Sequence, residues 1–141
     1  SLGEYNKENG TDYREIDFSK PTPVFNEQLQ EILAPWHGNY YRTHFLKLGP
    51  GGFFPPHRDT GVIDIESSRL ILPLKNVNPP NFNFILEEKR LHWKAGQLYF
   101  LNTAKMHYLF NCSFSDSYWL VVNVKVNQSS VEEVLKRFKQ K

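Results

Sequence analysis

Short apolar stretches separated by glycine and proline fill the middle of this sequence and constrain its fold most. Strand patterns cover 40–48, 68–74, 82–93 (a hairpin turning near Glu88 and Lys89), 96–102 and 118–126. Helical spacing occurs before this block, from an N-cap at Asn26 to Pro35, and after it, over about 130–140. Such an order predicts a mainly β sandwich, barrel or jelly roll with flanking N- and C-terminal helices.

The length of 141 residues predicts one domain over 1–141, with its core at about 40–126 and an extended lead at 1–20. A net charge of +2, from 17 basic and 15 acidic residues, is too small to indicate nucleic acid or a membrane surface as a partner. No apolar stretch is long enough to span a bilayer. The single cysteine, Cys112, excludes an internal disulfide and favours a reducing, cytoplasmic location.

The stretch "GPGGFFPPHRDTG" delivers His57 and Asp59 after a stiff run of glycine and proline. In extended chain, residues two positions apart point the same way, so the two side chains enter one space. His107 is the best third ligand, and His92 in "RLHWK" is its rival. Two imidazoles and one carboxylate leave three open positions on an octahedral ion, which suits Fe(II) that also binds a chelating co-substrate and dioxygen.

The segments "HRD", "SRLILPL", "GQLYFLNTAKMHYLFN" and "YWLVVNV" together resemble the core of the Fe(II)/2-oxoglutarate-dependent oxygenases. The aspartyl/asparaginyl β-hydroxylase-like and prolyl-hydroxylase-like branches are the most similar. The resemblance covers about 41–126. It implies a double-stranded β-helix, which is a cupin-like jelly roll, with iron held by His57, Asp59 and His107. It also implies that 2-oxoglutarate is decarboxylated to succinate while a substrate C–H bond is hydroxylated.

The sequence departs from this family at the residue that anchors the far carboxylate of 2-oxoglutarate. Many members carry an arginine about ten residues after the distal histidine, where this chain has Ser117. A buried dicarboxylate needs a basic partner, and an arginine fork fits a carboxylate best. Arg69, at the start of "RLILPL", is the favoured anchor and Arg42 is the alternative. Three further residues are expected beside the co-substrate: His44, Tyr99 and Ser117.

Two functions from different classes therefore remain. The first is a dioxygenase that hydroxylates an amino acid, a peptidyl side chain or a small metabolite. Its carboxylate ligand, Asp59, leaves no place for a halide and disfavours halogenation. The second is a cupin-like barrel that binds a metal or small ligand without oxygenase turnover, which the missing late arginine favours.

Overall fold

The computed structural model describes residues 2–59 and 67–138. Its strands are β1 (Tyr40–Leu48), β2 (Phe53–His57), β3 (Ser67–Lys75), β4 (Phe82–Leu86), β5 (Lys89–Arg90), β6 (Tyr99–Leu101), β7 (His107–Asn111) and β8 (Ser117–Lys125). Its helical segments are α1 (Leu2–Asn9), η1 (Glu15–Asp17), η2 (Phe25–Leu29), α2 (Gln30–Leu33), η3 (Ala34–Trp36) and α4 (Gln128–Arg137). Strands thus occupy the middle of the chain, and the helical segments lie toward its two ends.

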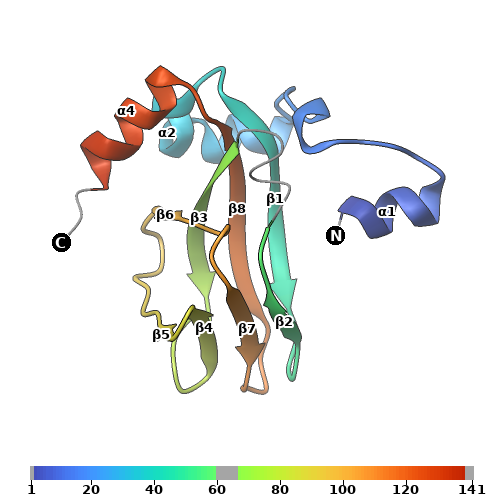
Figure 1. The fold of residues 1–141 in the computed structure, drawn as a ribbon, viewed down its shortest axis with the longest axis vertical. Coiled ribbons are helices and arrows are strands. Elements are labelled where there is room, and N and C mark those ends of the chain that lie inside the picture. Colours follow the sequence, from blue (N-terminus) through green and yellow to red (C-terminus); the bar gives the residue numbers. More distant parts are fainter. Residues whose placement is uncertain (1, 60–66, 139–141) are drawn as a thin grey trace.

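The strands form two four-stranded antiparallel sheets packed as layers (Figure 1). The first sheet has the order β1-β8-β3-β6 and the second has the order β2-β7-β4-β5. The chain crosses repeatedly between the layers, so neighbours in each sheet are mostly distant in sequence. This arrangement confirms the mainly β, cupin-like jelly roll that the sequence predicts.

Strand β8 lies inside the first sheet and is buried on both faces. Its residues Leu120, Val122 and Val124 pack in an apolar cluster with the helical segments on the outer face. The alternate residues Trp119 and Asn123 face the space between the two sheets. Because successive side chains of a strand point to opposite faces, β8 contributes side chains both to the outer apolar cluster and to the space between the sheets.

An aromatic cluster fills one end of the space between the sheets. The Trp119 ring lies 5.3 Å from Phe82, 5.7 Å from Phe84 and 5.6 Å from Trp93, measured between ring centroids. All four side chains are buried. Strand β8 runs from Trp119 in this cluster to Asn123, which lines the cavity described below.

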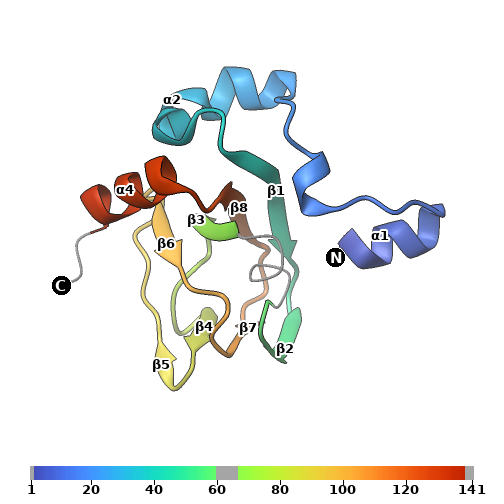
Figure 2. The same cartoon turned by 45° about the horizontal axis from the view of Figure 1, so that its top comes forward.

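The helical segments α2, η3 and α4 cover the outer face of the first sheet (Figure 2). Trp36 of η3 is 1% exposed and stacks on Phe138, with ring centroids 6.2 Å apart. The Arg137 guanidinium lies 5.8 Å from the centre of the Trp36 ring. These contacts join segments just over a hundred residues apart in sequence and close the outer apolar layer.

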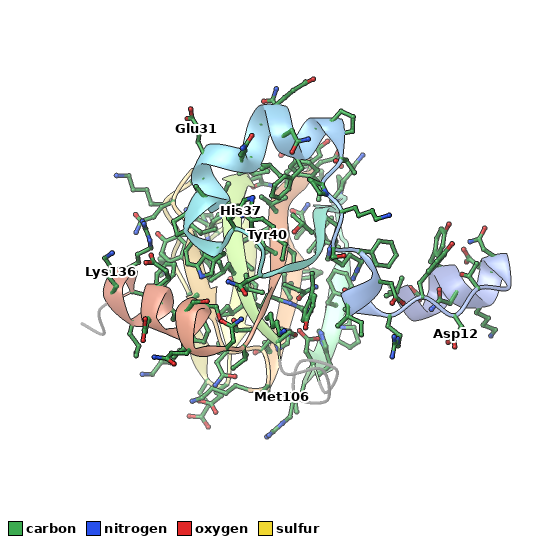
Figure 3. The ribbon with its side chains drawn as sticks, turned by 90° about the horizontal axis from the view of Figure 1, so that it is seen from above. Asp12, Glu31, His37, Tyr40, Met106 and Lys136 are labelled. Carbon is green, nitrogen blue, oxygen red and sulfur yellow. The ribbon has the colours of Figure 1, made fainter. Side chains whose placement is uncertain are left out.

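The N-terminal part of the chain differs from the prediction. The lead at 1–20, expected to be extended, instead contains helix α1 and the short η1 turn. Helix α1 buries none of its residues and lies to one side of the sheets (Figure 3). The expected N-cap at Asn26 is also wrong: the helical segment begins before Phe25, whose N–H donates to the Thr22 Oγ1, 3.3 Å away.

Two strands were not predicted, and both belong to the second sheet. Strand β2 contains Pro55 and Pro56, which weaken a strand pattern. The two prolines are tolerated because β2 is an edge strand. Their missing N–H groups therefore remove no hydrogen bonds between inner strands of the sheet. Strand β7 is only five residues long and follows a turn. Together these strands carry both histidines of the site.

No helix in the ranges 2–59 and 67–138 combines the length and apolar character needed to cross a bilayer.

Candidate metal centre

His57, Asp59 and His107 converge at one point between the sheets. His57 ends β2 and His107 begins β7, and the two residues face each other across the antiparallel pair. The Asp59 N–H donates to the Thr103 carbonyl at 2.9 Å, which fixes the chain just after β2. His57 Nε2 lies 3.6 Å from Asp59 Oδ1, and His107 Nε2 lies 3.9 Å from Asp59 Oδ2.

These three side chains offer one ligand atom each, all within 4.8 Å of one another. Atoms bound about 2.1 Å from one ion lie about 3 to 3.5 Å apart, so small side-chain movements bring all three onto a single metal. No other group of three His, Cys, Asp or Glu side chains is so arranged in the described part of the chain. The expected rival, His92, is exposed and lies outside this group.

Both imidazoles are held in the orientation that metal binding needs. His57 Nδ1 lies 2.7 Å from the Pro55 carbonyl, and His107 Nδ1 lies 2.9 Å from the Lys105 carbonyl. A carbonyl oxygen only accepts, so each Nδ1 carries the proton and donates it. Each Nε2 is therefore left with a free lone pair directed at the shared point, as in histidines that ligate metals.

Burial lowers the pKa of His107 below its ordinary value, and this outweighs the opposite effects of the Lys105 carbonyl and of Asp59. The imidazole is therefore neutral near pH 7. A neutral imidazole is the form that binds a metal ion, so the environment of His107 favours ligation.

The triad lies in a cavity of about 870 Å³ between the sheets. Its walls also carry Arg42, His44 and Arg69, three of the residues expected beside a co-substrate. Burial, together with the positive charges of Arg42 and Arg69, lowers the pKa of His44 to about 4. His44 is therefore neutral near pH 7, and the arginines supply the positive charge of this wall.

A polar row crosses the first sheet beside the triad. Arg69 on β3 is paired in register with Asn123 on β8, and Asn123 Nδ2 donates to the Arg42 carbonyl on β1 at 3.0 Å. The Arg69 Nε donates to Asn123 Oδ1 at 3.1 Å, and Arg69 Nη1 donates to the Asp59 carboxylate. The row therefore ends on a candidate metal ligand.

At its other end, the row is bound by a carboxylate from the N-terminal segment. Glu15 of η1 accepts from Arg42 Nε at 2.6 Å and from Arg42 Nη2 at 3.0 Å. Its Oε2 also accepts from Asn123 Nδ2 at 3.0 Å. Glu15, Asn123, Arg69 and Asp59 thus form one continuous hydrogen-bonded chain along the cavity.

Several buried polar atoms of the cavity have no partner within the protein. Of five such side-chain atoms in the described residues, three belong to residues that line this cavity: His44 Nδ1, Ser67 Oγ and Thr103 Oγ1. A buried polar group without a hydrogen bond is costly. A polar ligand in the cavity could supply the missing hydrogen bonds of these three atoms.

Two expected helpers do not line the cavity. The Ser117 side chain is fully buried and accepts from Trp119 Nε1 at 2.8 Å. The Tyr99 hydroxyl accepts from the Lys94 N–H at 2.9 Å, and its ring packs on Trp93. Neither hydroxyl faces the space that the triad borders, so a co-substrate role for them has no structural support.

Two residues of the polar row are absent from the sequence-predicted site. Asn123 is the one amide in the apolar run "LVVNV", and a polar residue on a strand buried on both faces is a signal that sequence reasoning can use. Glu15 lies in a polar segment without periodicity. Nothing in its local sequence indicates that it reaches the cavity.

Comparison with known proteins gives a family match and fold likenesses. Residues 9–127 match a family model described as aspartyl/asparaginyl beta-hydroxylase. No curated protein sequence matches the chain.

Among solved structures, the chain is similar to a predicted oxalate decarboxylase from Thermotoga maritima, with 20% identity over 69% of this chain and 74% of that one and a TM-score of 0.47. It is also similar to a cupin domain from Bordetella pertussis Tohama I, with 16% identity, coverages of 62% and 83% and a TM-score of 0.47. A Cupin 2 conserved barrel domain protein from Salinispora arenicola CNS-205 shows 14% identity, coverages of 84% and 79% and a TM-score of 0.45. These likenesses say nothing about activity.

Proposed function

Because the chain belongs to the aspartyl/asparaginyl β-hydroxylase family, we propose that it is a non-haem Fe(II)- and 2-oxoglutarate-dependent dioxygenase. It would hydroxylate an amino acid, a peptidyl side chain or a small metabolite, in the cytoplasm, with dioxygen as the oxidant. One observation carries the proposal: two imidazoles with free Nε2 atoms and one carboxylate share a point in a cavity that is also lined by three arginines, Arg42, Arg58 and Arg69.

The donor set fits Fe(II). Two imidazoles and a carboxylate on one side of an ion leave its other positions open, which is the pattern of non-haem Fe(II) oxygenases. The bound metal would supply the activation of dioxygen that couples decarboxylation of 2-oxoglutarate to hydroxylation of the substrate. His57, Asp59 and His107 would hold it, with the carbonyls of Pro55 and Lys105 fixing the two rings.

Arg69 is the favoured anchor for a carboxylate of 2-oxoglutarate. Its guanidinium lies beside Asp59, and the side chain is held by Asn123. With a metal bound, Asp59 would share its negative charge with the ion, which would leave the N–H groups of Arg69 available to an anionic co-substrate. Arg42, the alternative, is already occupied by Glu15.

A cupin-like barrel that binds a metal or small ligand without turnover is the second candidate. The observation that favours it is Ser117, which stands where many family members carry an arginine and which is buried beside Trp119, outside the cavity lining. No Arg or Lys lies between Lys105 and Lys125 to replace it. A binding barrel needs no such anchor.

An anaerobic titration separates the two candidates. Fe(II) is added to the purified chain, followed by 2-oxoglutarate, and the visible absorption is recorded. A weak charge-transfer band that requires both additions is the expected result, because the co-substrate must chelate the bound iron. Iron binding that 2-oxoglutarate leaves unchanged would favour the second candidate.

A further inference from the structure

The Glu15 carboxylate contacts the cavity wall in the way that a bound carboxylate ligand would. The Glu15 carboxylate receives two hydrogen bonds from the Arg42 fork and a third from the Asn123 amide. Paired contacts of this type are how proteins bind free carboxylates, because the planar guanidinium matches the two oxygens. Arg42 and Glu15 side chains are only 21% and 22% exposed, so solvent weakens the pair less than at an open surface.

Little apolar burial fastens the segment that carries Glu15. Helix α1 buries no residue, and the neighbouring aromatic side chains of Tyr5, Tyr13 and Phe18 are 50%, 47% and 39% exposed. Apolar burial is the main source of attachment for a chain segment, and here it is small. The hydrogen-bonded ion pair of Glu15 with Arg42 is thus a polar attachment of η1 to the barrel.

The same segment borders the cavity in a second place. Leu2 and Gly3 line the cavity together with Glu15, His57 and Arg69. Movement of the N-terminal segment away from β1 would thus free the Arg42 fork and remove part of the cavity wall at the same time.

We propose that Arg42 and Asn123 form a carboxylate-binding subsite and that the chain's own Glu15 occupies it as an internal competitor. A ligand carboxylate enters by displacing Glu15, and the N-terminal segment moves with it. Asn123 connects this exchange to the triad, because its amide is hydrogen-bonded to both Glu15 and Arg69. The subsite requires only a carboxylate ligand, so it does not depend on oxygenase turnover.

Charge removal at Glu15 tests the competition. Glu15→Gln keeps the shape of the side chain and weakens its hold on Arg42. Asp17→Asn is the matched control, since Asp17 lies on the same turn and pairs with Arg14 instead of Arg42. Succinate serves as the probe, titrated calorimetrically into the metal-free chain, and a denaturant curve shows that each variant is folded.

We expect Glu15→Gln to bind succinate about tenfold more tightly than wild type, because the substitution weakens the charge-assisted hydrogen bonds of the internal competitor. Asp17→Asn should bind like wild type, and adding Arg42→Ala to Glu15→Gln should abolish the gain. Equal or weaker binding by Glu15→Gln, or no binding by either protein, would overturn the proposal and leave the ion pair a structural contact. Because no metal is present, failure here is distinct from failure of the proposed function.

A second arm identifies which carboxylate the subsite takes. Glu15→Gln is saturated anaerobically with Fe(II) and 2-oxoglutarate, and succinate is titrated again. If bound 2-oxoglutarate abolishes the tighter succinate binding of Glu15→Gln, the subsite takes the far carboxylate of 2-oxoglutarate. If the tighter binding persists, the subsite takes a carboxylate of the primary substrate.

Hydrogen exchange tests the displacement itself. In the structure the Arg14 N–H donates to Asp17 Oδ2 at 2.7 Å, and the Asp17 N–H donates to the Arg14 carbonyl at 3.0 Å. Succinate should speed exchange of the amides at 11–17 in wild type, because the turn leaves β1. Unchanged exchange at saturating succinate would contradict the displacement.

Discussion

The two faces of the first sheet are built from the same strands and differ in almost every respect. On the outer face, Leu70, Leu72 and Val122 pack against helical segments in a closed apolar layer. On the inner face, the neighbouring positions Arg42, Asn123 and Arg69 form a hydrogen-bonded polar row beside the triad. The outer face is apolar under the helical segments, whereas the inner face is apolar at its aromatic end and polar beside the triad. Substitutions at adjacent residues should therefore affect different properties.

The largest effect is expected from the candidate metal ligands. His57→Ala, Asp59→Ala and His107→Ala should each lower Fe(II) affinity by about a thousandfold, roughly 4 kcal/mol, because each removes one of only three protein ligands. Fe(II) binding is measured anaerobically by competition with a chelator, and circular dichroism checks the fold.

His92→Ala is the control for these variants, since His92 is exposed and lies outside the triad. It should bind Fe(II) like wild type. Loss of binding in His92→Ala with full binding in His107→Ala would show that the third ligand is misassigned.

Leu70→Ala tests the outer face. Leu70 is fully buried in the outer apolar cluster. Its truncation should lower the free energy of unfolding by about 2–5 kcal/mol, from lost burial and the cavity left behind. Chemical denaturation measures this, and the folded variant should still bind Fe(II) with the affinity of wild type. A large loss of Fe(II) affinity in folded Leu70→Ala would break the separation of the two faces.

Arg69→Ala tests the inner face one residue away on the same strand. It should weaken 2-oxoglutarate binding by about one to two orders of magnitude, the loss expected for a charge-assisted bond of about 1.5–3 kcal/mol. Fe(II) binding should persist. Calorimetry at fixed Fe(II) compares this variant with Arg42→Ala, and unchanged 2-oxoglutarate affinity in both would remove the proposed anchor.

The smallest effect concerns the stability of the metal-free chain at acid pH. His44 has a pKa of about 4 in the folded protein, lowered by burial and by Arg42 and Arg69, against an ordinary value of 6.5. Between these values the unfolded chain binds a proton that the folded chain does not, so stability falls as the pH falls.

From this residue we expect a loss of about 1 kcal/mol between pH 7.5 and 5.5. Denaturation curves at both pH values, for wild type and His44→Gln, measure it. An equal acid dependence in the two proteins would contradict the assignment.

The sequence predicts those parts of the molecule that depend on local patterns. Alternation in "YWLVVNV" predicts β8, and the short apolar run "SRLILPL", bounded by turn residues, predicts β3. The spacing of His57 and Asp59 predicts that they point into one space, because that consequence of extended chain is local as well. His107 was predicted as the third ligand from its place after a strand and a tight connection, and the family resemblance implies the same residue. Its position opposite His57 depends on how distant strands meet.

Other features of the site depend on contacts over long sequence separations. Glu15 and Asn123 are 108 positions apart, and only the packing of η1 on β1 brings them together. The burial of Ser117 under Trp119 likewise follows from which face of β8 turns toward the aromatic cluster. The helix α1 was missed because its sequence has no apolar face, and the structure buries none of it.

The most direct test of the proposed function is turnover of 2-oxoglutarate. The iron-loaded chain is incubated with 2-oxoglutarate in air, alone and with panels of amino acids and peptides, and succinate is quantified. The proposed function predicts succinate formation that requires both Fe(II) and dioxygen, that rises with a true substrate, and that is lost in His107→Ala but not in His92→Ala. Iron binding without succinate formation under any of these conditions would contradict it and favour the barrel that binds without turnover.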